Sequence, residues 1–165
     1  LCLHHIYWRI LMRIMLLSLK NEVYNNIISG KKIFEHRKNF PDEDVMAYIY
    51  VSQPKKAICG IIYLSHKTYL SEWKDKYSYD SKAVERIEKQ LESARYVMQI
   101  DKYIHTNEIP LEKLRKDLTK FIVPQMYYYL EDTELLSYLK ENIKIQDLEI
   151  NNSFDSITSD MICIA

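Results

Sequence analysis

The chain contains few glycines, prolines and cysteines for its length. Two glycines, four prolines and three cysteines occur among its 165 residues. Cys2, Cys59 and Cys163 are far apart and form no C-x-x-C pair, which argues against a zinc knuckle or a disulfide framework and fits a reducing compartment. The sequence therefore predicts a cytoplasmic protein with no metal site and no cofactor.

Sequence motifs of several common enzyme classes are also missing. There is no P-loop, no G-x-G-x-x-G and no G-x-S-x-G, so nucleotide hydrolysis and serine-hydrolase chemistry have no support. His36, His66 and His105 each stand alone on a predicted strand, a placement more typical of a surface or half-buried residue than of a metal ligand. No catalytic residue can be assigned on these grounds.

The composition predicts one globular domain with an uneven charge distribution. A chain of 165 residues is long enough to bury a real core. Its formal net charge of zero hides an asymmetry, because residues 131–165 carry 8 acidic and 2 basic side chains. The remainder is mildly basic, which permits contact with a polyanion, and 14 tyrosines supply amphipathic rings suited to a wet binding surface.

Residues 1–14 have a different character from the rest. They are apolar but are interrupted by Arg9 and Arg13, so the run is too short and too charged to span a membrane. No small-residue cleavage site marks a signal peptide. We expect these residues to be an extension that the fold does not need, with Met15 or Met12 as the natural start.

The hydrophobic pattern predicts an α+β fold. The predicted strands and helices do not alternate regularly, and some strands follow one another directly, as in a hairpin. This order favours an α+β fold over a doubly wound sheet. Gly60, inside an apolar strand, indicates a bulge or a close backbone approach. Residues 70–80 form a helix or an irregular crossing, and poor order is expected over 145–165. The predicted strands are 15–20, 31–38, 45–51, 57–68, 94–106 and 122–129, and the predicted helices are 21–29, 81–92, one from Pro110 and one from Asp132 or Thr133.

The stretch from Ser29 to Lys38 concentrates charge on a short strand. Gly30 suits a helix C-terminus, because glycine enters the left-handed region without steric cost. Strand pleating then places Ile33, Glu35 and Arg37 on one face of the strand. Phe34, His36 and Lys38 fall on the other face. Taken alone, this pattern is also typical of a solvated edge strand with alternating charges.

The surroundings of this stretch add a family resemblance. Three features follow one another here: a strand ending in Leu-Ser-Leu-Lys, an amphipathic helix and a G-x-K-x-x-E-x-R signature. Their order resembles the opening of the ASCH domain, a PUA-like family. The stretch from Pro124 to Leu130 is similar to a late segment of some members. The resemblance spans residues 15–143 and leaves 144–165 as a C-terminal tail. It implies a small curved β-barrel of five to six strands flanked by helices. The residues that match are Lys20, Gly30, Lys32, Glu35 and Arg37.

The resemblance places the signature at a cleft, where its chemistry suits one unstacked nucleotide. Lysine and arginine can hold a phosphate or a base carbonyl, and Glu35 can accept from an amino or imino N–H. We expect Lys32 and Arg37 to hold phosphate and Glu35 to read a base edge in single-stranded RNA. Strand alternation puts Tyr127 and Tyr129 on one face, and we expect Tyr127 with Gln125 on the cleft side. The alternative is that Glu35 and Arg37 pair with neighbours, which contributes only about 0–1 kcal/mol when such pairs are exposed.

The predicted function is therefore an RNA- or nucleotide-binding module that regulates transcription or translation. Its expected partner is RNA, a nucleotide or a nucleoside. The competing hypothesis is a small enzyme acting on a modified nucleoside or RNA, either an amidohydrolase or a ribonuclease. The resemblance implies that an amidohydrolase would need a lysine and, three residues later, a threonine. Lys32 matches the lysine, but Glu35 replaces the threonine, and a carboxylate cannot stand in for an activated hydroxyl. The sequence does not indicate an oligomeric state.

Overall fold

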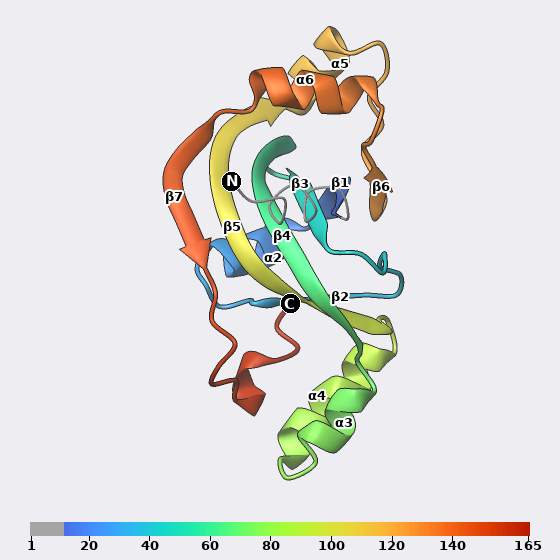
Figure 1. The fold of residues 1–165 in the computed structure, drawn as a ribbon, viewed down its shortest axis with the longest axis vertical. Coiled ribbons are helices and arrows are strands. Elements are labelled where there is room, and N and C mark those ends of the chain that lie inside the picture. Colours follow the sequence, from blue (N-terminus) through green and yellow to red (C-terminus); the bar gives the residue numbers. More distant parts are fainter. Residues whose placement is uncertain (1–11) are drawn as a thin grey trace, which may run out of the picture.

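The computed structural model describes residues 12–165, which form a curved sheet with helices at both ends (Figure 1). No helix within this range is both long and apolar enough to cross a membrane. The strands are β1 (Arg13–Leu19), β2 (Phe34–Arg37), β3 (Val45–Val51), β4 (Ala57–Tyr69), β5 (Tyr96–Pro110), β6 (Tyr127–Tyr129) and β7 (Ile145–Asn151). The helices are α2 (Asn21–Ile28), α3 (Glu72–Lys76), α4 (Ser81–Leu91), α5 (Leu111–Asp117) and α6 (Glu134–Asn142), followed by the 3-10 turn η1 (Ser159–Met161).

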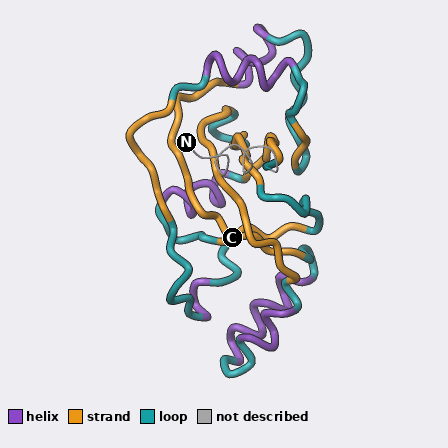
Figure 2. Tube along the Cα trace, viewed as in Figure 1, coloured by secondary structure: helices purple, strands orange, loops and turns teal. Residues whose placement is uncertain are grey.

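The sheet curls into a half-barrel built on the two long strands β4 and β5. Its order is β2-β5-β4-β3-β1-β6, and β7 adds to β5 beside this path. β1 and β3 run parallel, whereas every other pair is antiparallel. Figure 2 shows the strands gathered in the middle of the molecule, with helices above and below them. The α+β class and the strongly curved sheet predicted from the sequence are thus confirmed: within residues 12–165, six strands follow one path and β7 pairs with β5 beside it.

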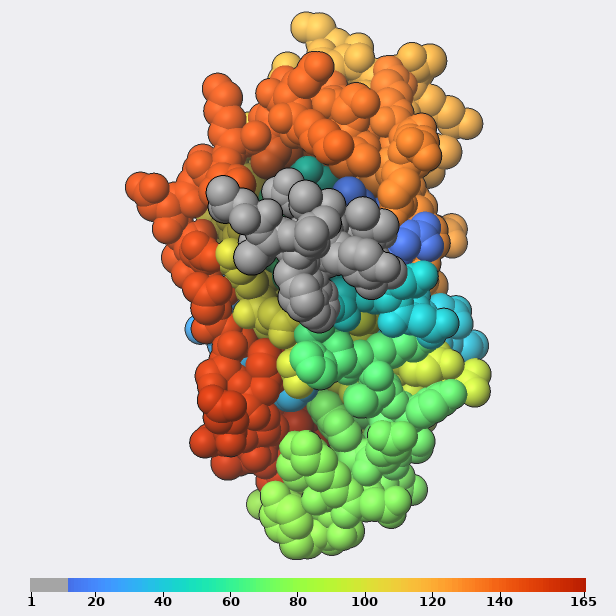
Figure 3. Space-filling model, in the orientation of Figure 1, coloured from blue at the N-terminus to red at the C-terminus, as the bar shows by residue number. Residues whose placement is uncertain are grey.

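Three apolar clusters hold the elements together. The first contains the side chains of α2 packed on β1, β3, β4 and β5, and the second buries α5 and α6 against the other face of these strands. The third joins β2 to α3, α4 and the end of the chain. In the space-filling view, α3 and α4 form one pole of the molecule and α5 and α6 the other (Figure 3). β2 and its charged residues therefore lie between the first and third clusters.

The first strand begins earlier than predicted. β1 starts at Arg13, which pairs with Val45 of β3, so residues 13 and 14 belong to the sheet and not to a dispensable extension. Arg13 Nε donates to Glu131 Oε1 at 2.8 Å, and the same oxygen accepts from Ile14 N at 2.9 Å. The charge of Arg13, which suggested an interruption of the apolar run, is thus paired with Glu131 where β1 begins. Residues 1–11 of the predicted extension lie outside the described residues.

The expectation of poor order over 145–165 is wrong. β7 pairs with β5, with Ile150 opposite Tyr103, because β5 is long enough to offer a free edge beyond β2. Asn152 continues the attachment by donating through Nδ2 to the Ile100 carbonyl at 2.7 Å. Ile162 is fully buried in the third cluster. The C-terminal tail is therefore a structural part of the fold.

Candidate functional site

The turn after α2 positions the signature residues. Gly30 adopts a φ of 76°, as the sequence predicts, and a side chain there would be strained. Its N–H donates to Ile27 O at 3.1 Å, and Lys32 N donates to Asn26 O at 2.9 Å, which closes the end of the helix. The chain then leaves the helix with Lys32 buried next to the start of β2.

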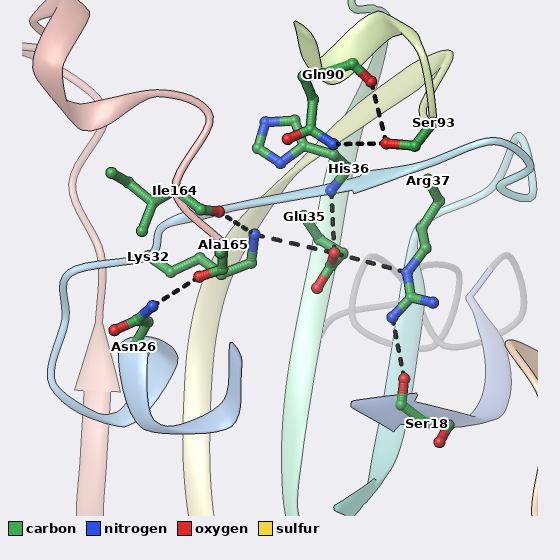
Figure 4. A network of polar contacts seen from close by, with 10 residues as sticks. All are labelled: Ser18, Asn26, Lys32, Glu35, His36, Arg37, Gln90, Ser93, Ile164 and Ala165. Atoms are coloured by element: carbon green, nitrogen blue, oxygen red, sulfur yellow. Dashed lines mark hydrogen bonds and ion pairs between the residues drawn. The ribbon is translucent and has the colours of Figure 1, made fainter. Parts of the chain in front are cut away.

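Strand β2 separates its side chains as pleating requires. Phe34 and His36 pack against the indole of Trp73, with ring centroids 4.9 and 5.8 Å apart respectively. Glu35 and Arg37 point to the opposite side, toward Lys32 (Figure 4). His36 is buried, although the sequence favoured a surface or half-buried position, because Trp73 of α3 covers it.

Glu35 is the centre of a small polar network. Its Oε1 accepts from the His36 backbone N–H at 3.1 Å and lies 3.6 Å from Arg37 Nε and 4.0 Å from Lys32 Nζ. Its Oε2 is buried and has no hydrogen-bond partner within residues 12–165. An unpartnered carboxylate oxygen that has lost its water is costly, so this atom is suited to accept a hydrogen bond from a ligand.

Arg37 is held by its neighbours on one side only. Its Nη2 donates to the Ser18 carbonyl at 3.0 Å, which ties β2 to β1 across the site. Its Nε faces Glu35 at a distance too long for a hydrogen bond and has no other partner in the described part of the chain. The alternative that Glu35 and Arg37 pair with neighbours is therefore partly realised, since they pair with each other.

Burial sets the charge states around Glu35. It lowers the pKa of Lys32 from its usual value, and the neighbouring Glu35 carboxylate partly opposes this shift. Burial, assisted by the Lys32 ammonium, lowers the pKa of His36 to about 3, so His36 is neutral at physiological pH. The site thus places the buried Lys32 amino group and the Arg37 guanidinium beside the Glu35 carboxyl group, next to a neutral imidazole.

These side chains line a cleft of about 420 Å³. Exposed Lys20 and Lys38 stand at its rim, while Lys32 and Glu35 lie at its buried base. Among the lining residues that fall within 12–165, four are basic and Glu35 alone is acidic. The full lining comprises Ser18, Leu19, Lys20, Val23, Lys32, Glu35, His36, Arg37, Lys38, Ser52, Gln90, Ser93, Gln125, Met126, Ile164 and Ala165.

The structure brings together most of the residues singled out in the sequence. Lys20, Lys32, Glu35, Arg37 and Gln125 all line the cleft, and their role in binding stays a prediction. Gly30 lies outside it and acts through the backbone. Tyr127, expected on the cleft side, does not line the cleft: its strand pairs with β1, and its ring packs against the first apolar cluster and against Tyr129, 5.8 Å away.

The sequence interpretation missed the contribution of the chain's last residues. Lys32 Nζ donates to the Ile164 carbonyl at 2.7 Å, and Asn26 Nδ2 donates to the Ala165 carbonyl at 2.8 Å (Figure 4). Main-chain carbonyls accept these bonds, so no residue type in the sequence signals them. Ser18 is a second omission of the same kind, because it contributes through its carbonyl.

Comparison with known proteins supports the fold. No protein-family model matches the sequence, and a search of curated proteins finds no match. Among solved structures, the ASCH protein from Zymomonas mobilis is similar, with a TM-score of 0.56 and 20% identity over 80% of this chain and 96% of that one. Two single-substitution variants of that protein match at TM-scores of 0.59 and 0.56, with 21% and 20% identity, over 78% and 80% of this chain and 96% and 99% of theirs. The chain therefore has an ASCH-like fold.

Proposed function

We propose that this chain is a cytoplasmic single-stranded RNA-binding module that reads one base in the cleft beside β2. The observation that supports the proposal most is the buried base of this cleft, where Lys32 offers a donor and Glu35 Oε2 an unused acceptor. Two exposed lysines, Lys20 and Lys38, stand at the rim of the same cleft. A regulatory role in transcription or translation belongs to the same proposal.

How deeply each basic side chain is buried determines which group of the ligand it can contact. Lys20 and Lys38 are exposed, so they can approach a phosphate without either group losing much water. Lys32 is only 3% exposed, and bringing a phosphate to it would desolvate a full charge. The sequence led us to expect that Lys32 holds a phosphate, but its burial favours a base carbonyl as its partner.

The donor and the acceptor together define a class of base. A ligand edge that carries a carbonyl oxygen beside an N–H would satisfy Lys32 and Glu35 at once. Uracil and guanine carry such an edge. Adenine instead places its amino N–H beside a ring nitrogen, which offers one in-plane lone pair where a carbonyl oxygen offers two, so we expect Lys32 to hold adenine less tightly. The proposed ligand is thus a single strand that presents an unstacked uracil or guanine.

Binding of fluorescein-labelled oligouridine and oligoadenosine, each about ten nucleotides long, tests this function. Fluorescence anisotropy should show tighter binding of oligouridine, and the affinity for both RNAs should fall as salt rises from about 50 to 200 mM, because the rim lysines displace counterions. The absence of salt-dependent binding to either RNA would show that the proposal is wrong. Equal affinity for oligouridine and oligoadenosine would show that Lys32 and Glu35 do not discriminate between bases.

A further inference from the structure

The base of the cleft is closed by the chain itself. Lys32 and Glu35, which the proposed function requires to meet a ligand, have side chains only 3% and 6% exposed. The carbonyl of Ile164 accepts a hydrogen bond from Lys32 Nζ, and Ala165 lines the cleft next to Ile164. A base could not reach the ammonium while Ile164 holds this position.

The end of the chain is attached in two distinct ways. Residues 158–162 are anchored: Ile162 is fully buried, the Ser159 hydroxyl donates to Asp80, and the Ser159 carbonyl accepts from Arg86. Residues 163–165, which we call the lid tip, are attached differently. Cys163, where the lid tip begins, packs against the third apolar cluster, while Ile164 is half-buried and Ala165 is exposed.

Only two side-chain hydrogen bonds to the lid tip occur within the described residues. They come from Lys32 to the Ile164 carbonyl and from Asn26 to the Ala165 carbonyl. Both acceptors are main-chain carbonyls, which water would satisfy if the tip moved outward. A ligand carbonyl would replace the Ile164 carbonyl at Lys32 without loss of a hydrogen bond.

A strained residue separates the anchored part from the lid tip. Cys163 has a φ of 55°, in the left-handed region that residues with a side chain rarely adopt. The preceding residue, Ile162, is extended, with φ −100° and ψ 158°. Rotation at Cys163 would relieve this strain and move the tip while Ile162 stays buried.

We propose that residues 163–165 form a lid that occupies the base-binding position and must swing out before a ligand binds. The Ile164 carbonyl serves as an internal substitute for the carbonyl of the base. This inference rests on the proposed function for the identity of the ligand, but the lid itself can be tested without RNA. Because only the open form is competent, the lid lowers the apparent affinity by the fraction of molecules that are open.

Two substitutions at Cys163 test the lid, and both remove the same side-chain contact with the third apolar cluster. Cys163→Pro fixes φ near −65°, which is incompatible with the seated tip, while the extended Ile162 already has the conformation that precedes proline. Cys163→Gly is the matched control, because glycine accepts the positive φ and leaves the tip in place. Both variants remove the thiol, so any difference between them reports the backbone.

The first readout is the acylation of lysines by acetic anhydride, measured by peptide mass spectrometry. Lys32 should react at least about tenfold faster in Cys163→Pro than in Cys163→Gly or the wild type, and exposed Lys20 should react equally in all three. If Cys163→Pro does not fold, Asn26→Ala, which removes the bond to Ala165, should raise Lys32 acylation in the same direction. Equal protection of Lys32 in all folded variants would overturn the lid.

The second readout is the affinity for oligouridine. Cys163→Pro should bind about tenfold more tightly than Cys163→Gly. Faster Lys32 acylation with unchanged or weaker RNA binding would overturn the inference that the tip competes with the ligand. If Lys32 becomes reactive and no variant binds RNA, the lid stands and the proposed function is wrong.

Discussion

Lys32 Nζ and the main-chain carbonyl of Ile164 are joined by a 2.7 Å hydrogen bond between residues 132 positions apart in the sequence. The contact makes the end of the chain part of the cleft that β2 and the turn after α2 create. It also fills the position that a ligand carbonyl would take. The properties of this cleft can be tested residue by residue.

Glu35→Gln tests the reading of the base. The substitution keeps the shape of the side chain but replaces one of the acceptor oxygens with a donor amide. The preference for oligouridine over oligoadenosine should shrink by about 1–3 kcal/mol, the scale of a good base-edge contact. Anisotropy titrations of both RNAs measure this, with Glu112→Gln on α5 as the control. An unchanged preference in a folded Glu35→Gln protein would exclude Glu35 from base recognition.

Lys20→Ala and Lys38→Ala test the rim of the cleft. Each should weaken the binding of both RNAs to a similar extent and lower the slope of log affinity against log salt by about one, because one phosphate contact is lost. Lys116→Ala removes an exposed charge on α5 and should leave the slope unchanged. If this control lowers the slope as much, the phosphates do not follow the cleft.

The buried imidazole of His36 should make stability fall in mild acid. Its pKa is about 3 in the folded chain, against 6.5 for the unperturbed group, so between these values the unfolded state binds a proton that the folded state does not. Stability is therefore retained above pH 6.5 and is lost as the pH falls below it. From pH 7 to pH 5 this single group should lower the free energy of unfolding by about 2 kcal/mol.

Urea unfolding of the wild type and His36→Leu at both pH values measures the effect. Leucine keeps an apolar contact for Trp73 and removes the Nε2 atom, which has no partner within residues 12–165. The wild type should lose about 2 kcal/mol more than the variant on acidification. Equal losses in the two proteins would show that His36 is accessible to protons in the folded state.

Gly60→Ala tests the packing inside the half-barrel. A Cβ at Gly60 would lie 2.7 Å from Tyr103 Cε2, and the ring is held because its hydroxyl shares hydrogen bonds with the Tyr24 hydroxyl and with His105 Nδ1. Because Tyr103 is fully buried, the substitution should destabilise the fold by about 1–3 kcal/mol in urea unfolding. A neutral result would mean that the Tyr103 ring can shift.

The local parts of this structure could be predicted from the sequence. The alternation from Val45 to Val51 gave β3 with its observed bounds, and Gly60 marks a bulge between β4 and β5 together with the close approach of Tyr103. Pleating alone placed Glu35 and Arg37 on one face. Each of these features depends on residues near one another in the chain, where periodicity and turn chemistry decide the outcome.

The parts that were missed depend on long-range pairing. β7 exists because β5 offers an edge, and nothing in the polar pattern of residues 145–151 indicates that partner. The burial of His36 depends on Trp73, which reaches it from another element. Tyr127 was misplaced because alternation fixes which residues share a face but not which face the sheet buries.

Backbone amide chemical-shift mapping with oligouridine tests the central claim most directly. The ¹⁵N-labelled wild-type chain is titrated with the RNA, and the shifted amides locate the site without any substitution. The largest shifts are expected at Lys20, across 32–38, at Gln125 and in the lid tip, 163–165. Shifts confined to α5 and α6, or the absence of shifts at the cleft when RNA is bound, would contradict it.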